Sequence, residues 1–111
     1  MSCVFCAIAA GDIPATVVHS TEQVVAFRDL NPVAPVHILV ISREHYQNVA
    51  ELAAHPAATA EVMAVAAQVA AAEGLDQGFR LVFNTGRDGG QEVEHVHAHV
   101  IGGRQMSWPP G

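Results

Sequence analysis

The segment His95-Val96-His97-Ala98-His99-Val100-Ile101 is the most informative part of the sequence. In a β-strand, successive side chains point to opposite faces, so residues two apart share a face. The pattern predicts a strand over 94–101 with its three histidines in a row on one face and the apolar residues between them packed against a core. A row of imidazoles can supply a nucleophile, an acid or base, or metal ligands near neutral pH.

A glycine-rich segment, Asn84-Thr85-Gly86-Arg87-Asp88-Gly89-Gly90-Gln91, leads into that strand. Glycines allow backbone N–H groups to approach an anion closely. Such a segment is more often a plain turn, but beside a row of histidines it favours a phosphate site. His37 lies in the apolar run 36–41, where a histidine is either an ordinary core residue or a further member of the site.

The remaining patterns predict an α+β fold with an antiparallel sheet of about five strands, one long helix and one or two short ones. Strands are expected over 17–19, 24–27, 36–41 and 79–84, with a loop over 29–35. Helices are expected over 5–10, from a cap at Ser42 through Leu52, and from Pro56 to about Glu73 with Gly74 as its end. The length of 111 residues fits one domain over 1–111.

Composition excludes several classes of function. The net charge is −6 and the five basic residues are isolated arginines, so we expect no nucleic-acid partner, which would require a basic stripe. The sequence contains no uninterrupted run of 18 apolar residues, so we expect no membrane span. The start of the chain lacks the pattern of a secretory signal. We therefore expect a cytoplasmic protein that holds any anionic ligand through local donors.

Residues 95–101 match the signature of the histidine triad (HIT) family, in which histidines alternate with apolar residues. The resemblance extends to 29–37, similar to that family's nucleoside-binding loop and strand. It continues through 88–93, 102–106 and the ending Trp108-Pro109-Pro110-Gly111, which resembles the Hint branch of purine nucleoside phosphoramidases. It implies the HIT fold over essentially the whole chain, and a homodimer that joins the two sheets.

The resemblance also implies catalytic roles. His97 would attack the α-phosphorus and form a nucleotidyl-histidine intermediate, which water then hydrolyses. His99 would stabilise the charge on the phosphate oxygens. His37 would orient the triad or help to protonate the leaving amine.

By the same resemblance, further residues would bind the nucleotide. Asp29 would accept hydrogen bonds from the ribose, and Trp108 in the tail would shape the choice of leaving group from the partner subunit. One position departs from the branch: Glu92 stands where Hint proteins often carry a serine near the leaving group, so it is not counted among the expected catalytic residues. The expected apolar base slot is formed by Val4, Phe5, Ile8 and Leu30, and the expected phosphate loop and its flank by Asn84, Gly89, Gly90, Gln91 and Val93.

Cys3 and Cys6 have the C-x₂-C spacing that is found in half of many zinc sites. The alternative is that they are two ordinary thiols that bind no metal. The resemblance to some bacterial members implies that His45 and His95 complete a Cys₂His₂ set. Such a zinc ion would be structural, and catalysis would require no cofactor.

The sequence thus predicts a hydrolase of purine nucleoside monophosphate derivatives, in the first place an adenosine phosphoramidase of the AMP-lysine type. Three alternatives remain open at this point: a dinucleoside polyphosphate hydrolase on the same fold, a nucleotide-binding regulatory protein with little turnover, and a metal-handling protein that uses the histidine row.

Overall fold

The computed structural model describes residues 3–111 and forms one antiparallel sheet with helices against it. The strands are β1 (Val17–Ser20), β2 (Val24–Arg28), β3 (Val36–Ser42), β4 (Phe79–Val82) and β5 (His97–Gly102). They lie in the order β1-β2-β3-β5-β4, and every neighbouring pair is antiparallel. The predicted α+β class and five-stranded sheet are confirmed.

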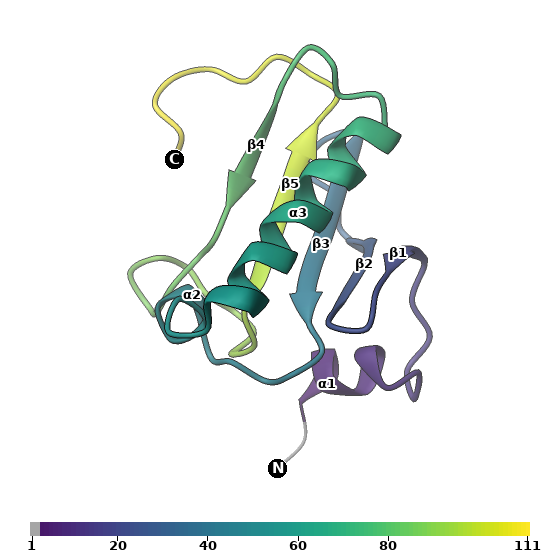
Figure 1. Ribbon diagram of the computed structural model, residues 1–111. Helices are drawn as coiled ribbons and strands as arrows, with labels where there is room; N and C mark the ends of the chain where they lie inside the picture. Colours follow the sequence, from purple (N-terminus) through teal and green to yellow (C-terminus); the bar gives the residue numbers. More distant parts are fainter. Residues whose placement is uncertain (1–2) are drawn as a thin grey trace.

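Within residues 3–111, three helices accompany the sheet: α1 (Val4–Ala9), α2 (Val49–Leu52) and α3 (Pro56–Ala72). In Figure 1, α3 lies across one face of the sheet, while α1 lies near the end of the β1–β2 hairpin. Proline is well suited to the first turn of α3, because that position has no intrahelical partner for its N–H. Gly74 takes a positive φ directly after the helix, as its C-terminal signal predicted.

Two separate apolar clusters form because strand residues alternate between the faces. The cluster under α3 contains Val96, Ala98 and Val100, as the period-two pattern predicted. The cluster on the opposite face contains Phe5 of α1 together with residues of β2 and β3. The histidines of β5 therefore lie on the face that α1, not α3, partly covers.

The last strand is shorter than predicted, since β5 begins at His97 and not at Glu94. The backbone N–H of Val96 donates to the carbonyl of Tyr46, at 2.7 Å, instead of joining the ladder. His95 thus lies in a bend before the strand, and the prediction that all three histidines belong to it is wrong for this residue.

The helix predicted from Ser42 to Leu52 is also wrong in its first half. Ser42 pairs with Val24 as the last residue of β3, so it is part of the sheet. Asn48 is the actual N-cap, accepting a 3.0 Å hydrogen bond from the backbone of Glu51.

The strand predicted over 79–84 likewise ends at Val82, which leaves Asn84 in the following loop. No helix over residues 3–111 has the length and hydropathy needed to cross a bilayer.

Candidate active site

A cavity of about 310 Å³ opens on the α1 face of the sheet. Residues from five parts of the chain line it: α1, the β2–β3 loop, β3, the segment between β4 and β5, and β5 itself. They are Phe5, Asp29, Asn31, Leu39, Asn84, Gly90, Glu92, Val93, His97 and His99.

The ring of His97 is fixed by the backbone of His95. Its Nδ1 lies 2.7 Å from the carbonyl oxygen of His95, an acceptor only, so Nδ1 carries the proton and donates. The other nitrogen, Nε2, is therefore unprotonated in the neutral ring and has no hydrogen-bond partner among residues 3–111. Phe5 packs edge-on against this ring, with centroids 5.1 Å apart. The result is a buried imidazole that presents a lone pair beside the cavity.

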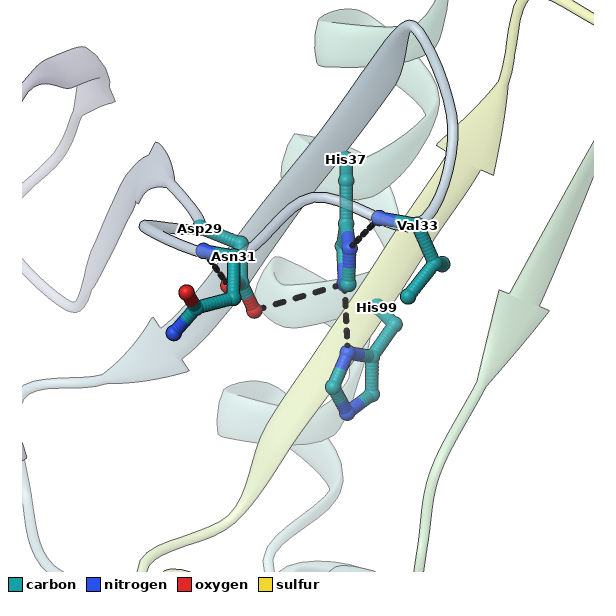
Figure 2. Close-up of polar contacts among 5 residues, drawn as sticks. All are labelled: Asp29, Asn31, Val33, His37 and His99. Atoms are coloured by element: carbon teal, nitrogen blue, oxygen red, sulfur yellow. Dashed lines mark hydrogen bonds and ion pairs between the residues drawn. The ribbon is translucent and has the colours of Figure 1, made fainter.

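His37 and His99 form a hydrogen-bonded pair across β3 and β5 (Figure 2). The backbone N–H of Val33 donates to His37 Nδ1 at 3.2 Å, so the proton of His37 must sit on Nε2. That Nε2 lies 2.9 Å from His99 Nδ1, which accepts a hydrogen bond from it. The proton of neutral His99 is consequently on Nε2, where it is available to donate to a ligand.

The surroundings keep His99 neutral near pH 7. Burial lowers its pKa to about 4, with smaller contributions in the same direction from His97 and His37 and an opposing one from Asp29. A neutral imidazole with a fixed Nε2–H is a hydrogen-bond donor, suited to a phosphate oxygen.

Of this pair, His99 lines the cavity and His37 does not. The side chain of His37 is buried, and its Nε2 also lies 3.5 Å from a carboxylate oxygen of Asp29. The other oxygen of Asp29 accepts the backbone N–H of Asn31 at 2.7 Å, which closes a tight turn at the cavity edge. This placement fits the predicted orienting role of His37 and gives it no direct access to a leaving group.

The glycine-rich loop is held by its own side chains. Asn84 donates to the carbonyl of Gly89 at 2.7 Å. Gln91, predicted to bind nucleotide, instead spans the loop: it accepts from the backbone of Gly86 and donates to the carbonyls of Gln47 and Val93. Gln91 does not line the cavity. A side chain at Gly89 would collide with the backbone oxygen of Thr85, so this position requires glycine.

The predicted base slot is only partly assembled. Phe5 and Val93 line the cavity, and Ile8 packs in the apolar cluster beside it. Val4, Leu30 and Trp108 do not line the cavity, and Leu30 and Trp108 are 92% and 85% exposed. Sequence reasoning missed Leu39 and Asn31 as residues that line the cavity. Leu39 could have been found, because it lies two residues after His37 and therefore on the same face of the strand.

A second cluster lies at the start of β5, where Cys3, Cys6, His45 and His95 converge with ligand atoms within 4.8 Å of one another. His95 Nδ1 lies 3.3 Å from Cys3 Sγ and 3.5 Å from Cys6 Sγ, and His45 Nδ1 lies 3.4 Å from Cys6 Sγ. A tetrahedral zinc site, with bonds of about 2.3 Å to sulfur and about 2.0 Å to nitrogen, separates such ligands by roughly 3.5 Å. The donor set and its spacing therefore fit zinc.

The orientation of His95 supports the same conclusion. The ring is fully buried, and its Nε2 lies 2.7 Å from the carbonyl of Ser42, to which it donates. Nδ1 is thus left as a lone-pair ligand, an arrangement common behind metal-bound histidines. Burial, with the nearby His45 and His97, lowers the pKa of His95 and keeps the ring neutral, as ligation requires.

Fold and site together define a small α+β protein with a histidine-lined cavity. Residues 10–106 match the model of the HIT domain, and the chain belongs to this family. It is 46% identical over 101 residues to an uncharacterized HIT-like protein of Synechococcus elongatus, covering 90% of this chain and 89% of that protein. A 14 kDa zinc-binding protein of Zea mays is 47% identical over 104 residues, covering 90% and 80%. The crystal structure of a HIT family hydrolase from Legionella pneumophila superposes with a TM-score of 0.95 at 47% identity, covering 99% and 100%.

Proposed function

We propose that this protein is a nucleotide hydrolase that acts on the α-phosphorus of purine nucleoside monophosphate derivatives, in particular adenosine phosphoramidates. One observation carries the proposal: the hydrogen bond from His97 Nδ1 to the backbone carbonyl of His95 leaves Nε2 as an unprotonated nucleophile beside a cavity. The likeness to a HIT family hydrolase from Legionella pneumophila supports hydrolysis as the reaction class.

The reaction proceeds in two displacements. In the first, the lone pair of His97 Nε2 forms a bond to phosphorus, and the P–N bond to the leaving amine breaks, with its electron pair passing to the amine nitrogen, which takes up a proton. In the second, water attacks phosphorus, the bond to Nε2 breaks, and the proton released by water balances the one taken up before. Splitting one difficult displacement into two lowers each barrier.

The phosphate oxygens are bound by neutral donors. His99 Nε2–H and the backbone N–H of Gly89 supply them, because the N–H of Gly90 already donates to the carbonyl of Arg87. Asn84 fixes the loop through its hydrogen bond to the carbonyl of Gly89. Donors that are already held in place stabilise developing charge without reorganising during the step. His37 keeps the His99 ring in its donating orientation.

The nucleoside lies on the β2–β3 side of β5. Asp29 accepts the ribose hydroxyls through the oxygen that does not close its turn. The base stacks in an apolar slot on Phe5 and Val93, with Leu39 at its floor and Ile8 behind, and a purine offers such a slot more area than a pyrimidine. Val4 and Leu30 would close over the outer edge of the slot only after moving from their exposed positions.

A dinucleoside polyphosphate hydrolase is the second candidate, and the charges oppose it. Its substrate carries several negative charges, yet the residues that line the cavity include two carboxylates and no arginine or lysine. A nucleotide-binding protein without turnover would have no need of the free Nε2 of His97.

We also propose that Cys3, Cys6, His45 and His95 hold a structural zinc ion, in accord with the zinc-binding relative from Zea mays. Four protein ligands leave no position for water, so the ion would supply stability and no catalytic chemistry.

The protein is further proposed to be a homodimer joined at the free edge of β4, with Trp108 reaching toward the partner's cavity.

The nucleophile is tested with purified wild type and His97→Ala on an adenosine–lysine phosphoramidate and on a diadenosine polyphosphate. Wild type should prefer the phosphoramidate and give an AMP adduct on His97 in acid-quenched mass spectrometry. His97→Ala should lose turnover and the adduct, while its nucleotide affinity stays within about 1–2 kcal/mol, because one hydrogen bond is lost and the base slot remains.

His19→Ala is the matched control, since this histidine lies on β1, outside the cavity lining. It should keep both turnover and the adduct. Full activity of His97→Ala would end the assignment of the nucleophile, and absence of turnover on both substrates by wild type would end the proposed reaction.

A further inference from the structure

Glu92 is a charged residue of the cavity wall that the proposed reaction leaves unused. It follows the glycine-rich loop, its side chain is exposed, and within residues 3–111 no hydrogen-bond or ion-pair partner holds it. A carboxylate beside a phosphate-binding cavity is unfavourable for the substrate phosphate itself. Its position therefore requires an explanation in terms of another part of the ligand.

No cationic side chain neutralises Glu92. The five arginines of the chain are all engaged elsewhere: Arg28 with Glu73, Arg43 with the β1–β2 hairpin and α1, Arg80 with Ser107, Arg87 with Asp88, and Arg104 with Val33. Burial lowers the pKa of His99 and keeps its ring neutral. The charge of the cavity wall is thus set by two carboxylates, Asp29 and Glu92.

The two carboxylates belong to opposite sides of the histidine strand. Asp29 comes from the loop between β2 and β3, and Glu92 from the segment between β4 and β5. Because the sheet order is β3-β5-β4, these segments flank β5 from its two sides. With the ribose at Asp29, Glu92 lies by the other end of the substrate, where the leaving group is.

We propose that Glu92 makes the enzyme select leaving groups that carry a positive charge beyond the scissile nitrogen, such as an alkylammonium, and disfavour those that carry a negative charge. This inference rests on the proposed function. An ammonium near a carboxylate is attracted and a carboxylate is repelled, and at an exposed site each effect changes kcat/KM by about threefold to tenfold. Glu92 acts on specificity alone and has no part in bond making.

The test uses three adenosine phosphoramidates that differ only in the end of the leaving amine: a terminal ammonium, a methyl group and a carboxylate. For wild type we expect kcat/KM to fall in that order, with a ratio of roughly tenfold or more between the first and the last. In Glu92→Gln the ratio should collapse to within about threefold, and in wild type it should shrink as salt is raised, because exposed charges are screened.

Asp88→Asn is the matched control. It removes another exposed carboxylate from the same loop, one that pairs with Arg87 and does not line the cavity. It should keep the wild-type ratio. Equal kcat/KM values for the three substrates in wild type, or an unchanged ratio in Glu92→Gln, overturn the proposed selection by Glu92. Neither result contradicts the proposed hydrolase activity. Failure of wild type to cleave any of the three substrates counts against the proposed function instead.

Discussion

The position of each proton on the imidazoles sets what the cavity residues can do. Val33 fixes the tautomer of His37, His37 fixes that of His99, and the backbone of His95 fixes that of His97. Each ring is held by an acceptor or donor that belongs to the backbone or to another ring. Nε2 of His97 is left with a lone pair, which suits an electrophilic phosphorus. Nε2 of His99 is left with a hydrogen, which suits the phosphate oxygens.

The low pKa of His99 predicts a dependence of stability on pH. A histidine with a pKa of about 4 in the folded protein and an ordinary value when unfolded binds its proton more readily in the unfolded chain. Its contribution to stability is complete above pH 6.5 and is lost as the pH falls toward 4, with a slope of up to about 1.4 kcal/mol per pH unit from this one group.

Urea unfolding of wild type and His99→Asn between pH 7.5 and 4.5 measures how the contribution of His99 to the free energy of unfolding changes with pH. The difference between the two free energies of unfolding should be largest at neutral pH and should shrink toward acid. Taking the difference cancels the other histidines common to both proteins. Curves that stay parallel over this range would contradict the assignment.

Among the elements, α1 depends most on contacts outside itself. It has six residues, too few to be stable alone, and it carries Phe5 into the cluster beside His97. The proposed zinc site ties α1 to the start of the histidine strand, because Cys3 and Cys6 belong to the cap of α1 and to α1, and His95 lies two residues before β5. Metal binding would thus position a wall of the cavity without entering the chemistry.

We therefore predict that removal of zinc lowers stability more than activity. Purified protein should contain about one zinc per chain by elemental analysis, and chelation should lower Tm by roughly 10 °C, because a tightly bound ligand contributes several kcal/mol to the folded state. Turnover measured below the new Tm should persist at a reduced level.

The double variant Cys3→Ser, Cys6→Ser provides the control. It should have the lower Tm from the start and should not respond to chelator. An unchanged Tm of wild type on chelation would contradict the structural role, and complete loss of turnover in folded, metal-free protein would mean that the ion has a part in catalysis.

For the whole molecule, the open edge of β4 is the feature that bears on assembly. The sheet order makes β4 an edge strand, with free backbone groups along one side, and Phe79 on it is 43% exposed. An edge of this kind is a template for pairing with another strand. Pairing of two β4 edges would join the sheets of two chains.

Sedimentation equilibrium tests this assembly. Wild type should have about twice the chain mass of 11.7 kDa at micromolar concentration. Phe79→Asp should shift the equilibrium toward the single chain, since it places a charge at the proposed contact, whereas Val17→Asp on the opposite edge strand β1 should not. A wild type that remains at 11.7 kDa across this range would exclude the dimer.

The local patterns predicted most of the elements and the separation of the two faces. Alternation along 96–100 correctly placed Val96, Ala98 and Val100 in the core, and Pro56 and Gly74 correctly bounded the long helix. The errors arose where a residue had a distant partner: Ser42 in the ladder with Val24, and Val96 bonded to Tyr46. Such pairings cannot be seen in a local pattern, because their partners are remote in sequence.

By itself, the sequence determined the α+β class, the histidine strand and the family resemblance, because side-chain period and turn residues are properties of neighbouring positions. Only the tertiary structure decided which residues line the cavity, which nitrogen of each imidazole carries the proton, and that Gln91 supports the loop while Glu92 lies on the cavity wall. Those features depend on contacts between segments far apart in the sequence, such as Phe5 and His97, and only the packed sheet brings such segments together.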